Sequence, residues 1–198
     1  MISRIHIYPV TSRPLGISYD EWSIKWWQWL CSIPIERNPA FDDTGELVYV
    51  NQNNAQVVFL CQTIEGTKNI PFRISHFPES GLFFMPIINW ISIMKCDGNN
   101  DEQLKEIAKC RMDAIGTLQI EINGKTFDKG LHKFRVLSSF FDIELPKNNI
   151  FGLDEGLRRC ISDGYWLFIH IDSDNLELSS YSSCSSGITQ IKVKYLLN

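Results

Sequence analysis

Histidines and acidic residues are the side chains of this sequence that could carry acid–base or metal chemistry. The four histidines are His6, His76, His132 and His170. Their spacing contains no H-x-H or H-E-x-x-H motif, and the chain has no paired-cysteine knuckle, so the sequence predicts no metal site. If the chain is a small hydrolytic or biosynthetic enzyme, we expect its acid–base set to come from His132, His170 and Asp163.

Two of these candidates, Asp163 and His170, also have a structural interpretation, because they lie in or next to a strand predicted around residue 166. His170 alternates with Trp166 and Phe168, which predicts a hydrogen-bonded core histidine on one face of a strand. Asp163 precedes Gly164, and this pair predicts a turn that leads into the strand. The chain contains no G-x-S-x-G motif, glycine-rich phosphate loop or dinucleotide fingerprint, so no cofactor is expected.

Two other clusters resemble sites but do not meet their requirements. Asp172, Asp174 and Asn175 offer oxygen ligands, but the central glycine and closing glutamate of a calcium loop are missing, so we predict a plain turn. Cys184 lies in the serine-rich run SSYSSCSSG, residues 179–187, which predicts a flexible surface loop. No neighbour in sequence would lower the pKa of this thiol, so it is expected to be inert.

Tryptophan is concentrated in one stretch, where four of the six tryptophans fall within eight residues. Large aromatic side chains at helical spacing usually belong to a core, in which each buries ~150–250 Å². Tryptophan is also over-represented where binding energy is concentrated. Both interpretations stay open, and under the second one the candidate ligand-binding residues are Trp22, Trp26, Trp27, Trp29 and Trp166.

The missing catalytic motifs favour a non-catalytic binding module over an enzyme. Its ligand would be a peptide or a small apolar molecule, bound in an aromatic cleft between a β-sandwich and the tryptophan-rich helix. That helix is apolar on most of its circumference, so it must be covered on two sides by its own fold or by a partner chain. A homodimer would be one way to cover it.

Length and composition limit the other classes. With 198 residues the chain fits one domain, residues 1–198. Its 19 Lys and Arg against 23 Asp and Glu include no basic block, which argues against a nucleic-acid partner. No run approaches the ~20 apolar residues that span a bilayer, so no membrane association is expected. Six scattered cysteines without a C-x-x-C pair predict reduced thiols and a cytoplasmic location.

Hydrophobic periodicity and turn residues predict the elements. Ser18 and Glu21 form a capping box at the start of a helix over residues 19–31, and a second, amphipathic helix is expected over residues 101–115. Asn123-Gly124 predicts a type I′ hairpin. Short strands are expected at residues 1–10, 47–50, 56–62, 71–75, 82–86, 118–122, 134–136, 139–145, 165–172 and 189–197. This pattern predicts an α+β, mainly β fold: an antiparallel, jelly-roll-like β-sandwich with an N-terminal tryptophan-rich helix and one inserted amphipathic helix.

Short motifs are spread over nearly the whole chain. They are W-x3-W-W-x-W (22–29), S-I-P (32–34), N-P (38–39), D-x-T-G (42–45), Gln52, V-x-F-L (57–60), Asn89, L-P-x-x-N (145–149) and D-G-Y-W (163–166). In this order they resemble a family of bacterial and archaeal hypothetical proteins without an assigned activity. The resemblance implies one domain of this architecture and no catalytic residue. Many of those proteins look secreted and carry a cysteine pair near the second and fourth strands; this sequence lacks it, which implies a cytoplasmic version.

Overall fold

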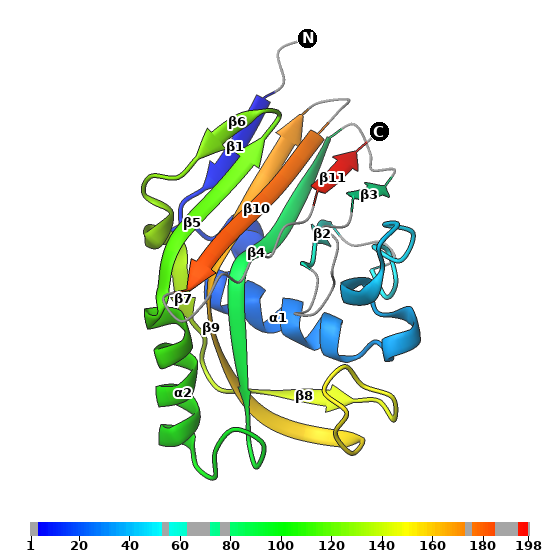
Figure 1. Ribbon diagram of the computed structural model, residues 1–198, viewed down its shortest axis with the longest axis vertical. Coiled ribbons are helices and arrows are strands. Elements are labelled where there is room, and N and C mark those ends of the chain that lie inside the picture. Colours follow the sequence, from blue (N-terminus) through cyan, green and yellow to red (C-terminus); the bar gives the residue numbers. More distant parts are fainter. Residues whose placement is uncertain are drawn as a thin grey trace.

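The computed structural model describes residues 4–52, 56–62, 72–75, 80–172, 176–184 and 194–197. Within these ranges the chain is mainly β, with two sheets and two α-helices, as the sequence predicts (Figure 1). No helix in the described ranges is both long enough and apolar enough to cross a membrane. The elements in chain order are β1 (Arg4–Tyr8), α1 (Tyr19–Cys31), β2 (Val57–Phe59), β3 (Phe72–Ser75), β4 (Ser80–Ile93), α2 (Asp101–Asp113), β5 (Ile115–Ile122), β6 (Lys125–Phe127), β7 (Arg135–Leu137), β8 (Phe141–Leu145), β9 (Gly156–Asp172), β10 (Leu176–Cys184) and β11 (Lys194–Leu197), with short 3-10 turns at Pro14–Gly16, Ile35–Arg37, Pro39–Phe41 and Leu131–Phe134.

The longest strand, β9, organises the first sheet. One of its edges pairs with β4 along almost its whole length, and the other edge is shared in succession by β8, β7 and β1. The second sheet has the order β3-β11-β10-β5-β6. Two strand pairs, β2 with β4 and β11 with β3, are parallel. The prediction of a purely antiparallel arrangement is therefore wrong at these pairs, whose strands are separated by long stretches of chain and need no tight hairpin.

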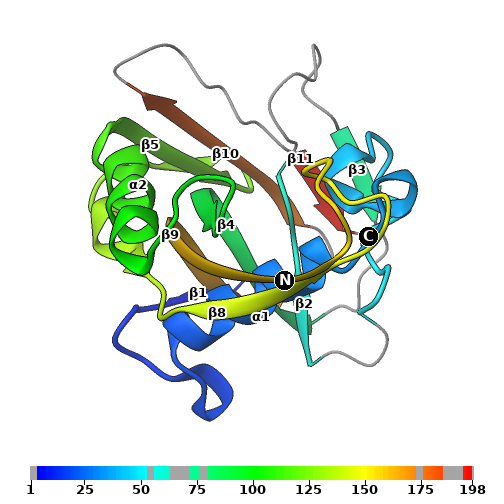
Figure 2. The same cartoon turned by 90° about the horizontal axis from the view of Figure 1, so that it is seen from below.

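Three layers are visible along the view of Figure 2: the second sheet, the first sheet and α1. One hydrophobic core fills the space between the two sheets, with Met85, Ile87, Leu167 and Ile169 from the first sheet facing Leu118, Ile120 and Leu178 from the second. The other core lies between the first sheet and α1. Because side chains alternate along a strand, β4 and β9 supply apolar residues to both cores.

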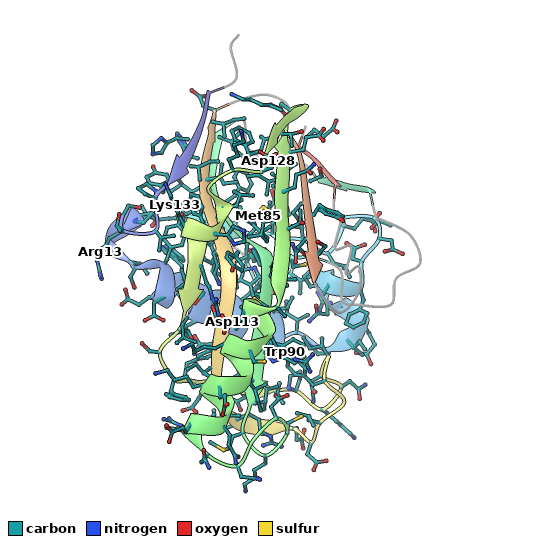
Figure 3. The ribbon with its side chains drawn as sticks, turned by 60° about the vertical axis from the view of Figure 1, so that its left-hand side comes forward. Arg13, Met85, Trp90, Asp113, Asp128 and Lys133 are labelled. Atoms are coloured by element: carbon teal, nitrogen blue, oxygen red, sulfur yellow. The ribbon has the colours of Figure 1, made fainter. Side chains whose placement is uncertain are left out.

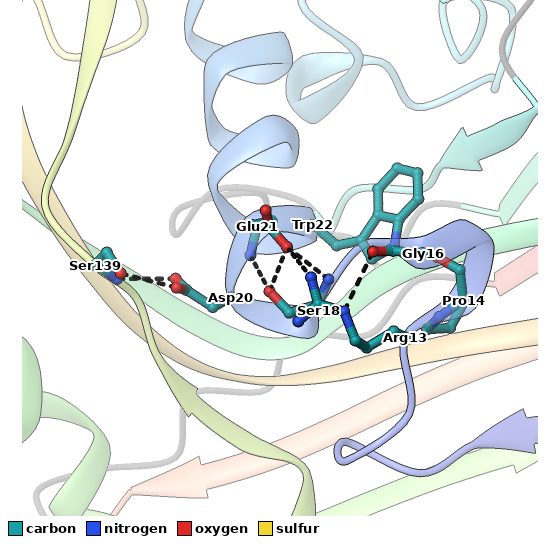
Figure 4. Close-up of polar contacts among 8 residues, drawn as sticks. All are labelled: Arg13, Pro14, Gly16, Ser18, Asp20, Glu21, Trp22 and Ser139. Atoms are coloured by element: carbon teal, nitrogen blue, oxygen red, sulfur yellow. Dashed lines mark hydrogen bonds and ion pairs between the residues drawn. The ribbon is translucent and has the colours of Figure 1, made fainter.

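Helix α1 has the bounds that its sequence predicts. The Ser18 backbone amide donates to Glu21 Oε2 (2.8 Å), and the Glu21 amide donates to Ser18 Oγ (3.3 Å), which completes the capping box. Arg13 pairs with the same carboxylate at 3.2 Å (Figure 4). Asp20 accepts 2.8 Å hydrogen bonds from both the amide and the hydroxyl of Ser139, which fixes the start of α1 against the segment that precedes β8.

The hairpin between β5 and β6 is also confirmed. Asn123 (φ 49°) and Gly124 (φ 74°) both adopt positive φ, as a type I′ turn requires, and Ile122 pairs with Lys125 across the turn. Helix α2 ends at Asp113, slightly before the predicted end at residue 115, because Ile115 already begins β5.

Three local predictions are wrong. Residues 47–50 form turns and not a strand. The serine-rich run that was expected to be a loop is strand up to Cys184, because β10 pairs with β5 from Leu178 onward; residues 185–187 lie outside the described ranges. Asp163 and Gly164 form no turn but lie in the middle of β9, opposite Trp90 and Asn89.

Candidate binding site at the C-terminal end of α1

The five tryptophans proposed to bind a ligand all lie in the core between α1 and the first sheet. Their side chains are at most 7% exposed. The Trp26 ring lies 5.2 Å from the Trp166 ring, which stacks on Phe84 at 5.1 Å. Trp27 contacts Trp26 edge-on at 5.0 Å. The structure therefore brings the tryptophans together as packing residues, and they line no open surface in the described part of the chain.

Three of the tryptophans on α1 tie neighbouring segments to the helix by hydrogen bonds. The indole N–H of Trp22 donates to the Pro14 carbonyl at 3.3 Å, and that of Trp26 donates to the Leu60 carbonyl at 3.0 Å. The third indole, Trp29, donates to the Val50 carbonyl at 2.8 Å. Helix α1 thus fixes the turn that precedes it, through Pro14, and the chain that follows it, through Val50 and Leu60.

The proposed acid–base set is not assembled. In β9, Asp163 shares the face of Tyr165, which belongs to the core between the sheets, and the His132 ring lies 5.6 Å from the Tyr165 ring. His170 shares the opposite face with Trp166 and lies across from His6 in β1. His76 lies outside the described residues.

Asp163 forms an ion pair with Arg135. The Arg135 Nε and Nη2 atoms donate to the Asp163 carboxylate at 2.7–3.1 Å, and Nη1 contacts Asp113 Oδ1 at 2.5 Å. Burial raises the pKa of Asp163, while the hydrogen bonds and charge of Arg135 oppose that rise. Asp113, labelled in Figure 3, is the last residue of α2. This network joins β7, β9 and α2, and it leaves the carboxylate enclosed.

Metal and thiol chemistry find little support among the described residues. These residues contain no group of three or more His, Cys, Asp or Glu side chains that could hold a metal ion.

Cys31 and Cys160 are buried thiols. Burial raises the pKa of Cys31 well above its ordinary value and that of Cys160 to about 12. Thiols with raised pKa values are poor nucleophiles. The side chain of Cys184, and the segment with Asp174 and Asn175, lie outside the described part.

A different region combines a fixed backbone with exposed apolar side chains. It consists of two loops, which we call the first loop (residues 35–52, after α1) and the second loop (residues 146–155, between β8 and β9). They lie side by side beyond the C-terminal end of α1 in Figures 1 and 2. The Ile35 amide donates to the Asn148 carbonyl at 2.8 Å, and Asn148 Nδ2 donates to Glu36 Oε1 at 2.6 Å.

The start of the first loop is fixed by Asn38. Its Nδ2 donates to the carbonyls of Leu30 (2.8 Å) and Ile33 (3.1 Å), which lie at and just after the end of α1. Its Oδ1 accepts from the Ala40 amide at 3.1 Å. One buried amide therefore satisfies carbonyl groups at the helix end and starts the next turn.

Asp42 fixes the middle of the first loop. Its carboxylate accepts hydrogen bonds from the amides of Thr44 (2.8 Å), Gly45 (3.0 Å) and Leu47 (2.8 Å) and from the Thr44 hydroxyl (2.7 Å). Burial alone would raise the pKa of Asp42, but these four hydrogen bonds outweigh it and lower the pKa. The ionised carboxylate therefore organises the D-x-T-G turn.

Gln52 fixes the end of the first loop. Its Oε1 accepts from the Phe59 amide (2.6 Å) and its Nε2 donates to the Phe59 carbonyl (3.0 Å), so the side chain pairs with β2 as a strand would. The same Nε2 contacts the Val48 carbonyl.

Asn149 fixes the second loop in a similar way. Its Nδ2 donates to the carbonyls of Pro146 (2.9 Å) and Leu153 (2.6 Å), and its Oδ1 accepts from the amides of Phe151 and Leu153 (3.2 Å each). Four polar side chains from the N-P, D-x-T-G and L-P-x-x-N motifs and position 52 are thus buried and hold these two loops: Asn38, Asp42, Gln52 and Asn149.

The first loop directs large apolar side chains outward. Ile35, Phe41 and Tyr49 are 38%, 41% and 36% exposed, whereas only Leu15 and Leu157 are comparable large apolar side chains elsewhere in the described ranges. Partial burial raises the pKa of Tyr49 to about 12. The sequence analysis missed these residues. The available signal was Ile35 and Phe41 in the irregular stretch between Pro34 and Gly45, whereas Tyr49 was assigned to a predicted strand over residues 47–50.

The comparisons with known proteins add no identification: no family model, no curated protein and no solved structure matches the chain. The motif resemblance therefore remains a resemblance, and the two loops are assessed on their geometry.

Proposed function

We propose that the protein is a non-catalytic binding module for a peptide or a small apolar ligand, and that the first loop is its contact surface. The observation that carries this proposal is the contrast within the loop. Its backbone is held by three buried polar side chains, Asn38, Asp42 and Gln52, while three large side chains, Ile35, Phe41 and Tyr49, are exposed. A rigid loop that exposes apolar side chains loses little conformational entropy when it binds.

The buried tryptophans support this surface indirectly. Trp29 donates a hydrogen bond to the Val50 carbonyl near the end of the first loop, and Asn38 connects the start of the loop to the end of α1. The aromatic residues would therefore position the contact surface without touching the ligand. A contiguous exposed apolar patch commonly marks an interaction site, and these three exposed side chains all belong to one loop.

Within the described residues, no geometric observation favours the enzyme alternative. His132 contacts Tyr165, Asp163 is bound to Arg135, and His170 belongs to the other face of β9. An acid–base pair needs the two groups within hydrogen-bonding reach of a substrate, so this arrangement gives the alternative no support.

Two further properties belong to the same proposal. The two sheets would form a jelly-roll-like β-sandwich, which is supported by the apolar core that they share. A cytoplasmic location is supported by the thiol form of Cys31, Cys96, Cys110 and Cys160.

Peptide selection from a random displayed library tests the binding function. The wild-type protein should enrich a peptide set, and the double variant Phe41→Ser, Tyr49→Ser should lose it. Leu15→Asn is the matched control, because Leu15 is an exposed apolar residue before the start of α1 and has φ 55°, a conformation that asparagine tolerates.

The control should keep the enriched set, and all three proteins should have similar melting temperatures. Enrichment that survives in the double variant would place the binding surface elsewhere. Binding of a second copy of the chain would instead appear as a dimer in light scattering that the double variant abolishes. Failure of the wild type both to enrich peptides and to self-associate would contradict the proposal.

A further inference from the structure

The formal charge of the protein is concentrated on the two loops. They contain six acidic residues, Glu36, Asp42, Asp43, Glu46, Asp154 and Glu155, against two basic ones, Arg37 and Lys147. Their charge of −4 equals that of the whole chain, because the remaining residues contain 17 acidic and 17 basic side chains. The charges of the remaining residues therefore sum to zero, and the net charge of the chain equals that of these two loops.

The charges are available to a partner. Of the six carboxylates only Asp42 is buried; the other five are exposed, as are both basic side chains. Glu36 adjoins the exposed Ile35, and Asp43 lies two residues from the exposed Phe41. The apolar side chains thus lie among acids, within the ~8–10 Å over which charges act at physiological salt.

We infer that the partner of this surface is a protein segment that combines apolar and basic residues, an inference that rests on the binding function proposed above. The apolar side chains of the partner would pack on Ile35, Phe41 and Tyr49, and its lysines or arginines would face the surrounding carboxylates. Charge complementarity of this kind speeds association and rejects acidic competitors.

The same charges disfavour two other classes of partner. Nucleic acids and anionic membrane surfaces would place negative charge against the five exposed carboxylates. A neutral apolar ligand would gain nothing from them. The acids therefore distinguish among the ligands that the apolar side chains alone would accept.

Three synthetic peptides test the inference. They share the same apolar residues and carry lysine, serine or glutamate at the remaining positions, and their affinities are measured by titration calorimetry at low and high salt. The lysine peptide should bind about threefold to tenfold more tightly than the serine peptide at low salt, and this advantage should shrink at high salt. The glutamate peptide should bind most weakly.

Charge-neutralising variants locate the effect. Asp43→Asn with Glu46→Gln should weaken the lysine peptide by about twofold to tenfold and leave the serine peptide unchanged. Glu106→Gln with Asp128→Asn is the matched control, because it removes one glutamate and one aspartate from exposed positions on α2 and after β6. This control should leave both affinities unchanged.

The outcomes separate the inference from the function on which it rests. If the serine peptide binds as tightly as the lysine peptide and Phe41→Ser weakens both, the binding function stands and the basic partner is refuted. If the control pair weakens the lysine peptide as much as the loop pair does, the charge acts from the whole molecule and the inference is also refuted. If no peptide binds, or Phe41→Ser has no effect, both proposals fail.

Discussion

The phenol hydroxyl of Tyr19, at the first residue of α1, accepts a hydrogen bond of 3.0 Å from the backbone amide of Phe168 in β9. The same hydroxyl donates to the Tyr8 carbonyl at 2.5 Å. Tyr8 is the last residue of β1 and the cross-strand partner of Phe168. One side chain from the helix therefore continues the ladder at the point where β1 leaves the sheet.

Replacement of this hydroxyl should be costly. Tyr19→Phe keeps the ring but leaves a buried amide and a carbonyl without their partner, which should lower the free energy of unfolding by about 1–3 kcal/mol. Urea denaturation measures the change. Tyr181→Phe, which removes a hydroxyl from a half-buried side chain in β10, is the control and should change stability by much less. Equal losses in the two variants would show that the bridge contributes nothing specific.

Asp42 should make the free energy of unfolding fall more steeply as the pH is lowered into the acid range. Its pKa in the folded protein lies below the ordinary value of 3.8, so its contribution is fully present above pH 3.8 and is lost as the pH falls through the folded pKa. Asp42→Asn should cost about 1–3 kcal/mol at neutral pH, and the difference from wild type should shrink in strong acid. The measurement is denaturant unfolding between neutral pH and about pH 2. Asp43→Asn, at the neighbouring exposed carboxylate, is the control and should change stability at neutral pH by much less.

Gly164 should tolerate no side chain. A Cβ atom there would lie 2.7 Å from Asn89 Cβ and 3.0 Å from Asn89 Cα in the paired strand β4. Gly164→Ala must therefore separate two central strands, and we expect a loss of about 1–3 kcal/mol or more. Gly116→Ala is a matched control within a strand, because the nearest atom to its Cβ would be 4.0 Å away. Thermal unfolding of the two alanine variants tests this prediction. Equal melting temperatures would contradict the close approach of β9 to β4 at Gly164.

The cysteines should differ sharply in reactivity. Cys96 and Cys110 are exposed, whereas Cys31 and Cys160 are fully buried between α1 and the first sheet. Alkylation of the native protein, followed by peptide mapping, should label the first two in minutes and the second two only when the protein unfolds. Labelling of Cys31 and Cys160 as fast as Cys96 would mean that α1 opens from the sheet at little cost.

Local signals were enough to predict some elements from the sequence. The capping box of Ser18 and Glu21 sets the start of α1, and Asn123-Gly124 sets the hairpin; both depend on residues close together in the chain. The strand β10 could not be predicted, because serine is not a strong strand former. Its pairing with β5, and the contact of Ser180 with Gln62 at 2.9 Å, come from distant segments.

The candidate site was harder to predict than the fold for the same reason. Sequence spacing correctly grouped the tryptophans, but it could not tell whether that group faces a ligand or the rest of the core. Phe41 points outward because the side chain of the neighbouring Asp42 points inward. There its carboxylate accepts hydrogen bonds from the amides of Thr44, Gly45 and Leu47. That arrangement follows from the fold of the loop and has no periodic pattern.

The pairing of Gln52 with Phe59 has a consequence for the behaviour of the protein in concentrated solution. The outer edge of β2 would otherwise present free backbone groups, which are a template for strand addition and aggregation. The Gln52 side chain saturates both backbone groups of Phe59 on that edge. The Gln52 side chain therefore occupies backbone groups that a strand of another molecule would need for pairing. This makes edge-to-edge polymerisation at β2 less favourable, without the charged residue or proline that protects many sheet edges.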